Sequence, residues 1–149
     1  MAGEMNREIA YSLLRITYGV IFVTTGTSKF LVGLSDFVGG MNQRFSGKLP
    51  AAVVMPFAFA IPFCEVIAGI LILIGLFTRV GLTITGLLLI GLTFGVTWLG
   101  DAATVAHNLQ YVLINFVLLW FVEFNRYSVD ALYGRRTPAS LSSAKEEVL

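Results

Sequence analysis

Two charged residues stand deep inside apolar stretches of this 149-residue sequence, and they are the first candidates for chemistry. Glu65 lies at the centre of the apolar run at 53–77, and Arg15 lies within the run at 9–30. A carboxylate at the middle of a bilayer costs roughly 2.5 kcal/mol or more when it faces lipid, so Glu65 must face protein, be paired or be neutral. We therefore predict that Glu65 and Arg15 are catalytic residues. The alternative for Glu65 is an inert anchor that is hydrogen-bonded to a neighbouring helix.

Other polar residues share helical faces with this pair. The residues of the first run that recur at spacings of four and three, and so form one stripe along a helix, are Tyr11, Arg15, Tyr18, Phe22, Thr25 and Lys29. Asn108, Tyr111 and Asn115 share a face of the last apolar run in the same way. Lys29 is equally well explained as a residue that extends its amine to the membrane surface. The residues that we predict to bind a ligand are Lys29, Tyr11, Tyr18, Arg79, His107, Asn108, Tyr111 and Asn115.

A buried arginine also needs a partner of its own. Counting from the expected helix ends at ~1.5 Å per residue places Arg15 about 9 Å and Glu65 about 18 Å from the same membrane face. A direct ion pair between the two residues therefore requires a shifted helix boundary or a bridging water. Glu123 is an equally good partner for Arg15.

The residue types present exclude several chemistries. A single histidine leaves a haem without a suitable pair of axial ligands, and zinc or iron lacks a ligand set, so we predict no haem and no metal. The single cysteine, Cys64, excludes an internal disulfide or a CxxC redox pair. Buried Glu, Arg, Asn, Tyr and His side chains suit a hydrophobic molecule with a polar head, such as a quinone, whose reduction they can supply with protons.

The elements that must position these residues are transmembrane helices. The chain is 56% hydrophobic and only 13% charged, whereas soluble domains carry about 25% charged residues. Its apolar runs are long enough to cross a hydrocarbon core of roughly 30 Å. We predict an all-α, integral membrane four-helix bundle within residues 1–130, followed by a polar cytoplasmic tail at 131–149. The predicted spans are 9–30, 53–77, 80–100 and 105–124.

The connections and helix interiors lead to more local predictions. The link at 31–52 is predicted to contain a short amphipathic helix in the membrane interface, with Ser35 as its N-cap. Pro56 and Pro62 are expected to kink the first half of the second span, which favours a pocket there. Gly91 and Gly95 form a GxxxG pair, for which packing inside the molecule is favoured over dimerisation.

Basic residues set the expected orientation. With four crossings, the two termini and the turn at Arg79 share one side, which collects six Lys and Arg residues against three on the other. The positive-inside rule then places both termini in the cytoplasm, in a bacterial-type inner membrane. No cleavable signal is expected in the first apolar run. The net charge of +1 and the lack of a long basic run give no indication of nucleic-acid binding.

The stretches LLRITYGVIFVTTGTSKF and CEVIAGILILIGLFTR resemble the DoxX/DoxD family of small four-helix membrane proteins over residues 13–81. The matching positions are Arg15, Gly19, Gly26, Lys29, Glu65, Gly69, Gly75, Thr78 and Arg79. The resemblance implies the four-helix fold and a link to quinones, since the family includes the membrane part of thiosulfate:quinone oxidoreductase. Related bundles act as assembly factors or bind sterols. The resemblance does not cover Asn108, Tyr111 or Asn115.

Three functional hypotheses follow. The first is a quinone-binding membrane subunit of an oxidoreductase, which needs a partner protein that supplies electrons. The second is a non-catalytic accessory or assembly subunit of a larger membrane complex. The third, a small transporter or proton path, is disfavoured because four helices without an internal repeat make alternating access hard to build. The expected partners are therefore the lipid bilayer, other protein subunits and a hydrophobic small molecule.

Overall fold

The computed structural model describes residues 2–134, and over this range its regular structure is entirely helical. This confirms the predicted all-α class. The elements in chain order are α1 (Ala2–Val32), α2 (Leu34–Arg44), α3 (Ala51–Ile74), α4 (Thr78–Leu99), α5 (Ala102–Trp120), the 3-10 turn η1 (Val122–Phe124) and α6 (Val129–Gly134). The predicted tail beyond residue 134 lies outside the described residues.

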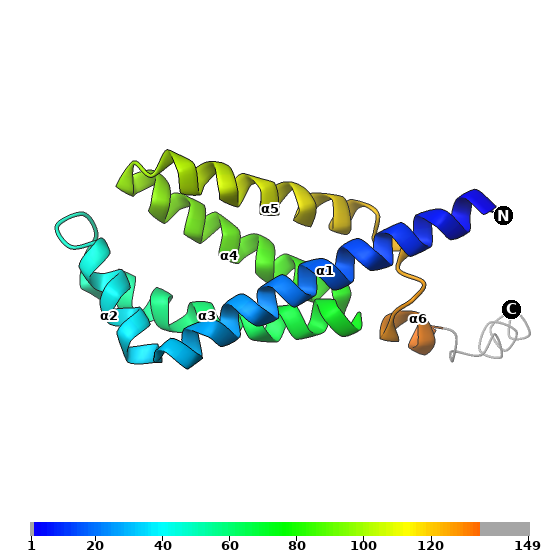
Figure 1. Cartoon of the computed structure of the whole chain (residues 1–149), viewed down its shortest axis with the longest axis horizontal. Coiled ribbons are helices and arrows are strands. Elements are labelled where there is room, and N and C mark those ends of the chain that lie inside the picture. The colour runs from blue at the N-terminus through cyan, green and yellow to red at the C-terminus, as the bar shows by residue number, and fades with distance from the viewer. Residues whose placement is uncertain (1, 135–149) are drawn as a thin grey trace, which may run out of the picture.

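Four of the described helices are long and apolar enough to span a membrane: Gly3–Val32 within α1, and α3, α4 and α5. The chain is therefore a multi-pass membrane protein. In Figure 1 the start of α1, the α3–α4 turn and α6 lie at one end of the bundle, which we call the terminal end. α2 and the α4–α5 turn lie at the other end, which we call the α2 end.

The helix ends at the α3–α4 turn differ from the predicted span bounds by two or three residues, for a local reason. α3 ends at Ile74 rather than 77 because Gly75 adopts a left-handed conformation, in which the N–H groups of Gly75 and Leu76 donate to the carbonyls of Ile72 and Leu71. α4 then begins at Thr78, inside the stretch predicted to be a turn.

The last span also differs from its predicted range. α5 begins at Ala102 rather than 105 because Asp101 caps it, accepting hydrogen bonds from the N–H and hydroxyl of Thr104. It ends at Trp120, since the chain then tightens into the 3-10 turn η1. The first span begins earlier than predicted, at Ala2, so the short polar leader is helical.

α1 and α3 pack closely because glycines line their contact. A Cβ atom built on Gly19 would lie 2.7 Å from the backbone nitrogen of Leu73, and one on Gly69 would lie 2.7 Å from that of Val23. Such small residues allow two transmembrane backbones to approach each other. α4 packs on α3, and α5 packs on α4.

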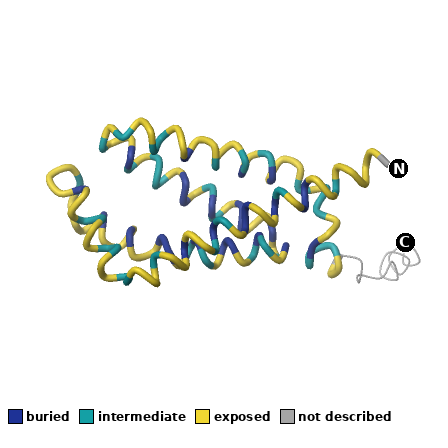
Figure 2. The backbone as a smooth tube through the Cα atoms, viewed as in Figure 1, coloured by how far each residue is buried: buried dark blue, intermediate teal, exposed yellow. Residues whose placement is uncertain are grey.

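The buried residues form inward-facing stripes, while the outer surface is apolar and exposed. Figure 2 shows the buried positions on the faces that the helices turn toward one another. The largest fully buried apolar side chains include Tyr18, Ile61, Ile72, Leu82 and Leu118. Large exposed apolar side chains such as Leu87, Ile90 and Leu113 cover the outside, as expected for helices that contact the lipid bilayer.

The predicted short helix in the first link is present as α2, but the predicted N-cap is wrong. Ser35 lies inside α2, and Gly33 occupies the N-cap position with a φ of 108° that a side chain would strain. None of the residues of α2 is fully buried, which agrees with a helix on the membrane surface. Pro56 and Pro62 do not interrupt α3, which continues through both as one helix.

Candidate functional site

The most buried ion pair among the described residues joins α1 to α3. Lys29 Nζ lies 2.5 Å from Glu65 Oε2, and the Glu65 side chain is 7% exposed. The carboxylates of the other two described ion pairs, Arg44–Asp101 and Arg126–Glu8, are more exposed, at 29% and 20%. Glu65 is thus a paired, buried carboxylate, as its depth in the second span requires.

Gly26 allows this pair to form. It lies nearly one turn before Lys29, and a Cβ atom at this position would stand 2.9 Å from Glu65 Cβ. The close approach of the helices lets the flexible lysine stem reach back along α1 to the carboxylate. Lys29 therefore points into the bundle, so the alternative in which it extends to the membrane surface is not what the structure shows.

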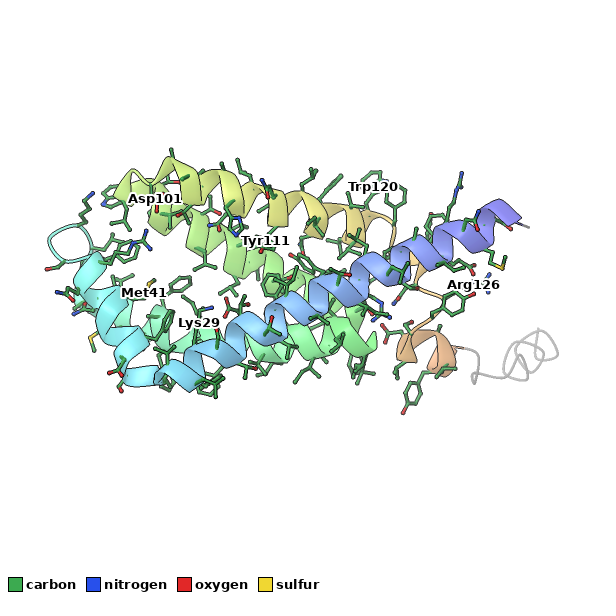
Figure 3. All side chains as sticks on the ribbon, in the orientation of Figure 1. Lys29, Met41, Asp101, Tyr111, Trp120 and Arg126 are labelled. Carbon is green, nitrogen blue, oxygen red and sulfur yellow. The ribbon has the colours of Figure 1, made fainter. Side chains whose placement is uncertain are left out.

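One aromatic ring lies against the ion pair, and others pack together nearby in the bundle. The ammonium of Lys29 lies 5.6 Å from the ring centroid of Phe37 on α2, close enough for a cation–π interaction. Figure 3 shows Met41 of α2 and Lys29 on one side and Tyr111 of α5 across from them. Tyr111 is partly buried and packs edge-on against both Phe22 and His107.

A second polar cluster lies within the bundle and joins three helices. Asn115 Oδ1 accepts hydrogen bonds from the Thr85 hydroxyl at 2.8 Å and from the Tyr18 hydroxyl at 3.3 Å. The predicted Tyr18 and Asn115 are therefore brought together, and their hydrogen bonds are made within the protein. Sequence reasoning missed Thr85, because a threonine in a transmembrane helix usually bonds a carbonyl of its own helix, as Thr85 also does.

Arg15 belongs to a third cluster, and this arrangement differs from the predicted catalytic pair. Its guanidinium donates to the backbone carbonyls of Ile72 and Leu73 at the end of α3 and to that of Tyr127. The two acceptors on α3, Ile72 and Leu73, lie about two helical turns, or ~10 Å, from Glu65 along that helix. Among the described residues Arg15 forms no ion pair, with Glu65 or with Glu123.

The geometry of Arg15 indicates a structural role. Carbonyls at a helix C-terminus lack partners within the helix, and a cation there also complements the helix dipole. Arg15, 2% exposed, thus fastens the end of α3 to α1 and to the segment after η1. Asp130 fastens the same turn from the other side by accepting the N–H groups of Phe77 and Thr78.

The remaining predicted ligand-binding residues are distributed over the two ends. Tyr11 donates its hydroxyl proton to the carbonyl of Leu118 at 2.9 Å. Arg79 is exposed and lines an open cavity of about 520 Å³ at the terminal end. Near the α2 end, Asn108 is buried and His107 is exposed. The structure therefore divides the ten predicted residues among three levels and does not gather them into one site.

The fold and this geometry can be compared with known families. A family model described as "Methylamine utilisation protein MauE" matches residues 7–105, which is more than half of the chain. The chain belongs to the MauE family. This MauE-family chain has no match among curated proteins, and none among solved structures. The sequence resemblance to DoxX/DoxD thus led to the right kind of protein, a small multi-pass membrane protein, and the family that is shown is MauE.

The MauE match includes the buried ion pair and excludes part of its surroundings. Lys29, Glu65 and the α2 residues between them lie within residues 7–105, whereas His107 and Tyr111 follow the matched range. Membership in this family associates the chain with methylamine utilisation and agrees with an accessory role in the membrane. Across residues 2–134 no three His, Cys, Asp or Glu side chains are grouped to hold a metal ion, and the absence of a bound metal stays a prediction.

Proposed function

We propose that this MauE-family chain is an accessory membrane subunit for an oxidoreductase of methylamine utilisation, and that it holds a quinone at Lys29 and Glu65. The observation that carries the proposal is the buried Lys29–Glu65 ion pair beside Phe37. A charge pair at membrane depth is costly and rare, and it is retained mainly where it has a function. The MauE match supports the association with methylamine utilisation.

The pair suits the head of a quinone chemically. The Lys29 ammonium can donate a hydrogen bond to a quinone carbonyl oxygen, and Phe37 and Tyr111 offer aromatic faces against the ring. An oxygen that gains electron density as the ring is reduced can take a proton from the Lys29 ammonium, and the Glu65 carboxylate can take up a further proton and relay it. Full reduction takes two electrons and two protons, so a partner oxidoreductase must supply the electrons.

We also propose an orientation with both termini in the cytoplasm of a bacterial-type inner membrane. The Lys and Arg residues of the sequence support it, six against three. In this orientation α2 lies on the outer face, and the Lys29–Glu65 pair is closer to that face. A partner that delivers electrons would then dock on the periplasmic side, over α2 and the α4–α5 turn.

A specific set of contacts favours a second candidate, a non-catalytic assembly subunit that holds no small molecule. Arg15, Tyr11, Tyr18 and Asn115 all make hydrogen bonds within the protein. If the Lys29–Glu65 ion pair is likewise a structural contact, the chain acts only by binding partner proteins within the membrane.

Quinone content separates the two candidates. Protein purified in mild detergent is extracted, and quinone per chain is measured by mass spectrometry for the wild type, Glu65→Gln and the matched control Glu123→Gln, an exposed carboxylate of η1. The proposal expects near-stoichiometric quinone in the wild type and the control, and a loss of most of it in Glu65→Gln. Equal quinone in all three, or none above the membrane background, would leave the assembly role as the better account.

A paired variant keeps this test informative if Glu65→Gln folds poorly. Removing one member of a buried pair leaves a lone charge, whereas replacing both by apolar residues is often tolerated. Lys29→Met combined with Glu65→Leu therefore should fold and lose the quinone. If this double variant retained wild-type quinone, the site would have to lie elsewhere.

A further inference from the structure

A second apolar site lies at the α2 end, between α2, α3 and α4. It is a cavity of about 210 Å³. Its apolar lining includes Met41, Phe45, Val54, Phe57, Leu92 and Val96. None of the residues assigned above to quinone binding lines it, so the inference drawn from this cavity is independent of the proposed function.

Two glycines of α4 form the floor of this cavity. A Cβ atom on Gly91 would lie 2.6 Å from the Phe57 ring, and one on Gly95 would lie 3.1 Å from the Phe45 ring. The GxxxG pair thus accommodates aromatic rings of the same chain, which bears out its predicted use in internal packing. The glycines also keep the space beside these rings open.

The cavity faces the hydrocarbon of the bilayer. Two of its lining residues, Val53 on α3 and Phe94 on α4, are 59% and 58% exposed. Along α4 its lining residues extend from Gly91 to Val96, which is about 8 Å of helix at ~1.5 Å per residue. An apolar cavity offers water no hydrogen-bond partners, so a flexible hydrocarbon chain is the suitable occupant.

The mouth of the cavity carries a net positive charge. Arg44 lines the cavity, and Lys48, one turn further along the chain, donates to the carbonyl of Leu99 at the end of α4. Asp101 neutralises one of these cations, since its carboxylate lies 2.8 Å from Arg44 Nη2. The exposed Trp98 at the same end is typical of the headgroup level of a bilayer. An apolar slot therefore lies beneath a cationic mouth.

We infer that this cavity binds one acyl chain of an anionic phospholipid, whose phosphate lies against Arg44 and Lys48. The acyl chain fills the space beside Gly91 and Gly95, and the phosphate complements the charge that Asp101 leaves uncompensated. The bound lipid completes the packing of α2, which has no fully buried residue of its own, against the bundle.

Native mass spectrometry with a defined lipid mixture tests this assignment. The purified full-length protein is exchanged into detergent with equal amounts of phosphatidylglycerol and phosphatidylethanolamine, and retained lipids are counted by mass. The wild type should retain one phosphatidylglycerol in preference. Arg44→Gln combined with Lys48→Gln should weaken that binding by at least roughly fivefold, because each basic residue near an anionic headgroup contributes about that factor. The exposed pair Arg7→Gln and Arg126→Gln at the terminal end is the control.

Two further variants distinguish charge from structure. Asp101→Asn keeps an N-cap for α5 but frees Arg44, so it should bind phosphatidylglycerol as well as the wild type or more tightly. Val53→Trp fills the apolar slot and should reduce retention of both lipids, whereas Leu113→Trp on the exposed face of α5 should not. If the double glutamine variant assembled poorly, Lys48→Gln alone, at an exposed position, would make the same comparison.

Several results would overturn the assignment. These are undiminished phosphatidylglycerol binding in the glutamine variants, undiminished lipid retention in Val53→Trp, and a quinone or a second copy of the chain in place of the lipid. Loss of phosphatidylglycerol in Asp101→Asn would also contradict it, since the Arg44–Asp101 pair would then act only by holding α2 in place.

Discussion

The side chains of Lys29 and Glu65 stabilise each other's charge in the half of the bundle nearer α2. We predict that Lys29→Met alone lowers stability by about 3 kcal/mol, since it leaves a buried carboxylate without its cation. The measurement is thermal unfolding in detergent, with Arg7→Met, at an exposed basic residue, as control. Restoration of wild-type stability by adding Glu65→Leu is expected. A melting temperature equal to the wild type for Lys29→Met would mean that Glu65 has another partner.

Arg15, in contrast to Lys29 and Glu65, is expected to affect stability but not quinone binding. Its guanidinium satisfies three backbone carbonyls from two segments, so Arg15→Ala should destabilise the protein by a clear margin over Arg7→Ala at an exposed position. Arg15→Lys should rescue only part of the loss, because an ammonium lacks the planar fork. Quinone per folded chain should be unchanged in Arg15→Lys. A folded Arg15→Lys protein without quinone would restore the catalytic role predicted from the sequence.

At the scale of elements, the contact between α1 and α3 depends on small residues. Gly26→Val should push α3 away at the level of Glu65, because the Cβ already lies within 3 Å of that side chain and of Val66. We expect a lower melting temperature and a weakened ion pair. Gly39→Val on α2 is the matched control, since nothing lies within 4 Å of its Cβ position. Similar melting temperatures for the two variants would contradict the packing described.

At the α2 end, the contacts of the Asp101 carboxylate depend on pH. The hydroxyl and N–H of Thr104, and then Arg44, stabilise the charged form of Asp101 and lower the pKa of its carboxyl from the ordinary value of 3.8. A lowered pKa means that this contribution to stability is present above about pH 4 and is lost as the pH falls through the folded-state value. The melting temperature should therefore drop on acidification below pH 4, and less so in Asp101→Asn. Parallel pH profiles would show that Asp101 does not hold the α4–α5 turn.

The elements were largely predictable from sequence, whereas the pairing of their side chains was not. Apolar length and period place four spanning helices. Of the predicted stripe, Tyr11, Arg15, Tyr18 and Phe22 are buried, whereas Thr25 is exposed. The sequence analysis did not predict the Lys29–Glu65 ion pair, because it compared the depths of backbone positions only. The long side chain of Lys29 extends along α1 to a carboxylate at a different depth. Arg15 was assigned the wrong kind of partner, since backbone carbonyls freed by the left-handed Gly75 cannot be read from residue types.

At the scale of the whole molecule, polar groups are arranged in layers within a lipid-facing bundle. Hydrogen bonds of Arg15 and Asp130 join the segments at the terminal end, and those of Asn115 join the helices in the middle. The α2 end contains the buried ion pair and the lipid-facing cavity. The proposed ligand sites lie on the side of α2, which is also where we propose that a partner protein docks.

The central claim is that a quinone head binds beside the Lys29–Glu65 pair, and photo-crosslinking locates it most directly. A quinone analogue with an azide on its ring is irradiated with the purified wild-type protein, and labelled peptides are mapped by mass spectrometry. The account predicts labelling near Lys29 and Glu65 that excess unlabelled quinone suppresses and that Lys29→Met with Glu65→Leu removes. Labelling confined to the terminal end around Arg79, or unaffected by the double variant, would contradict it.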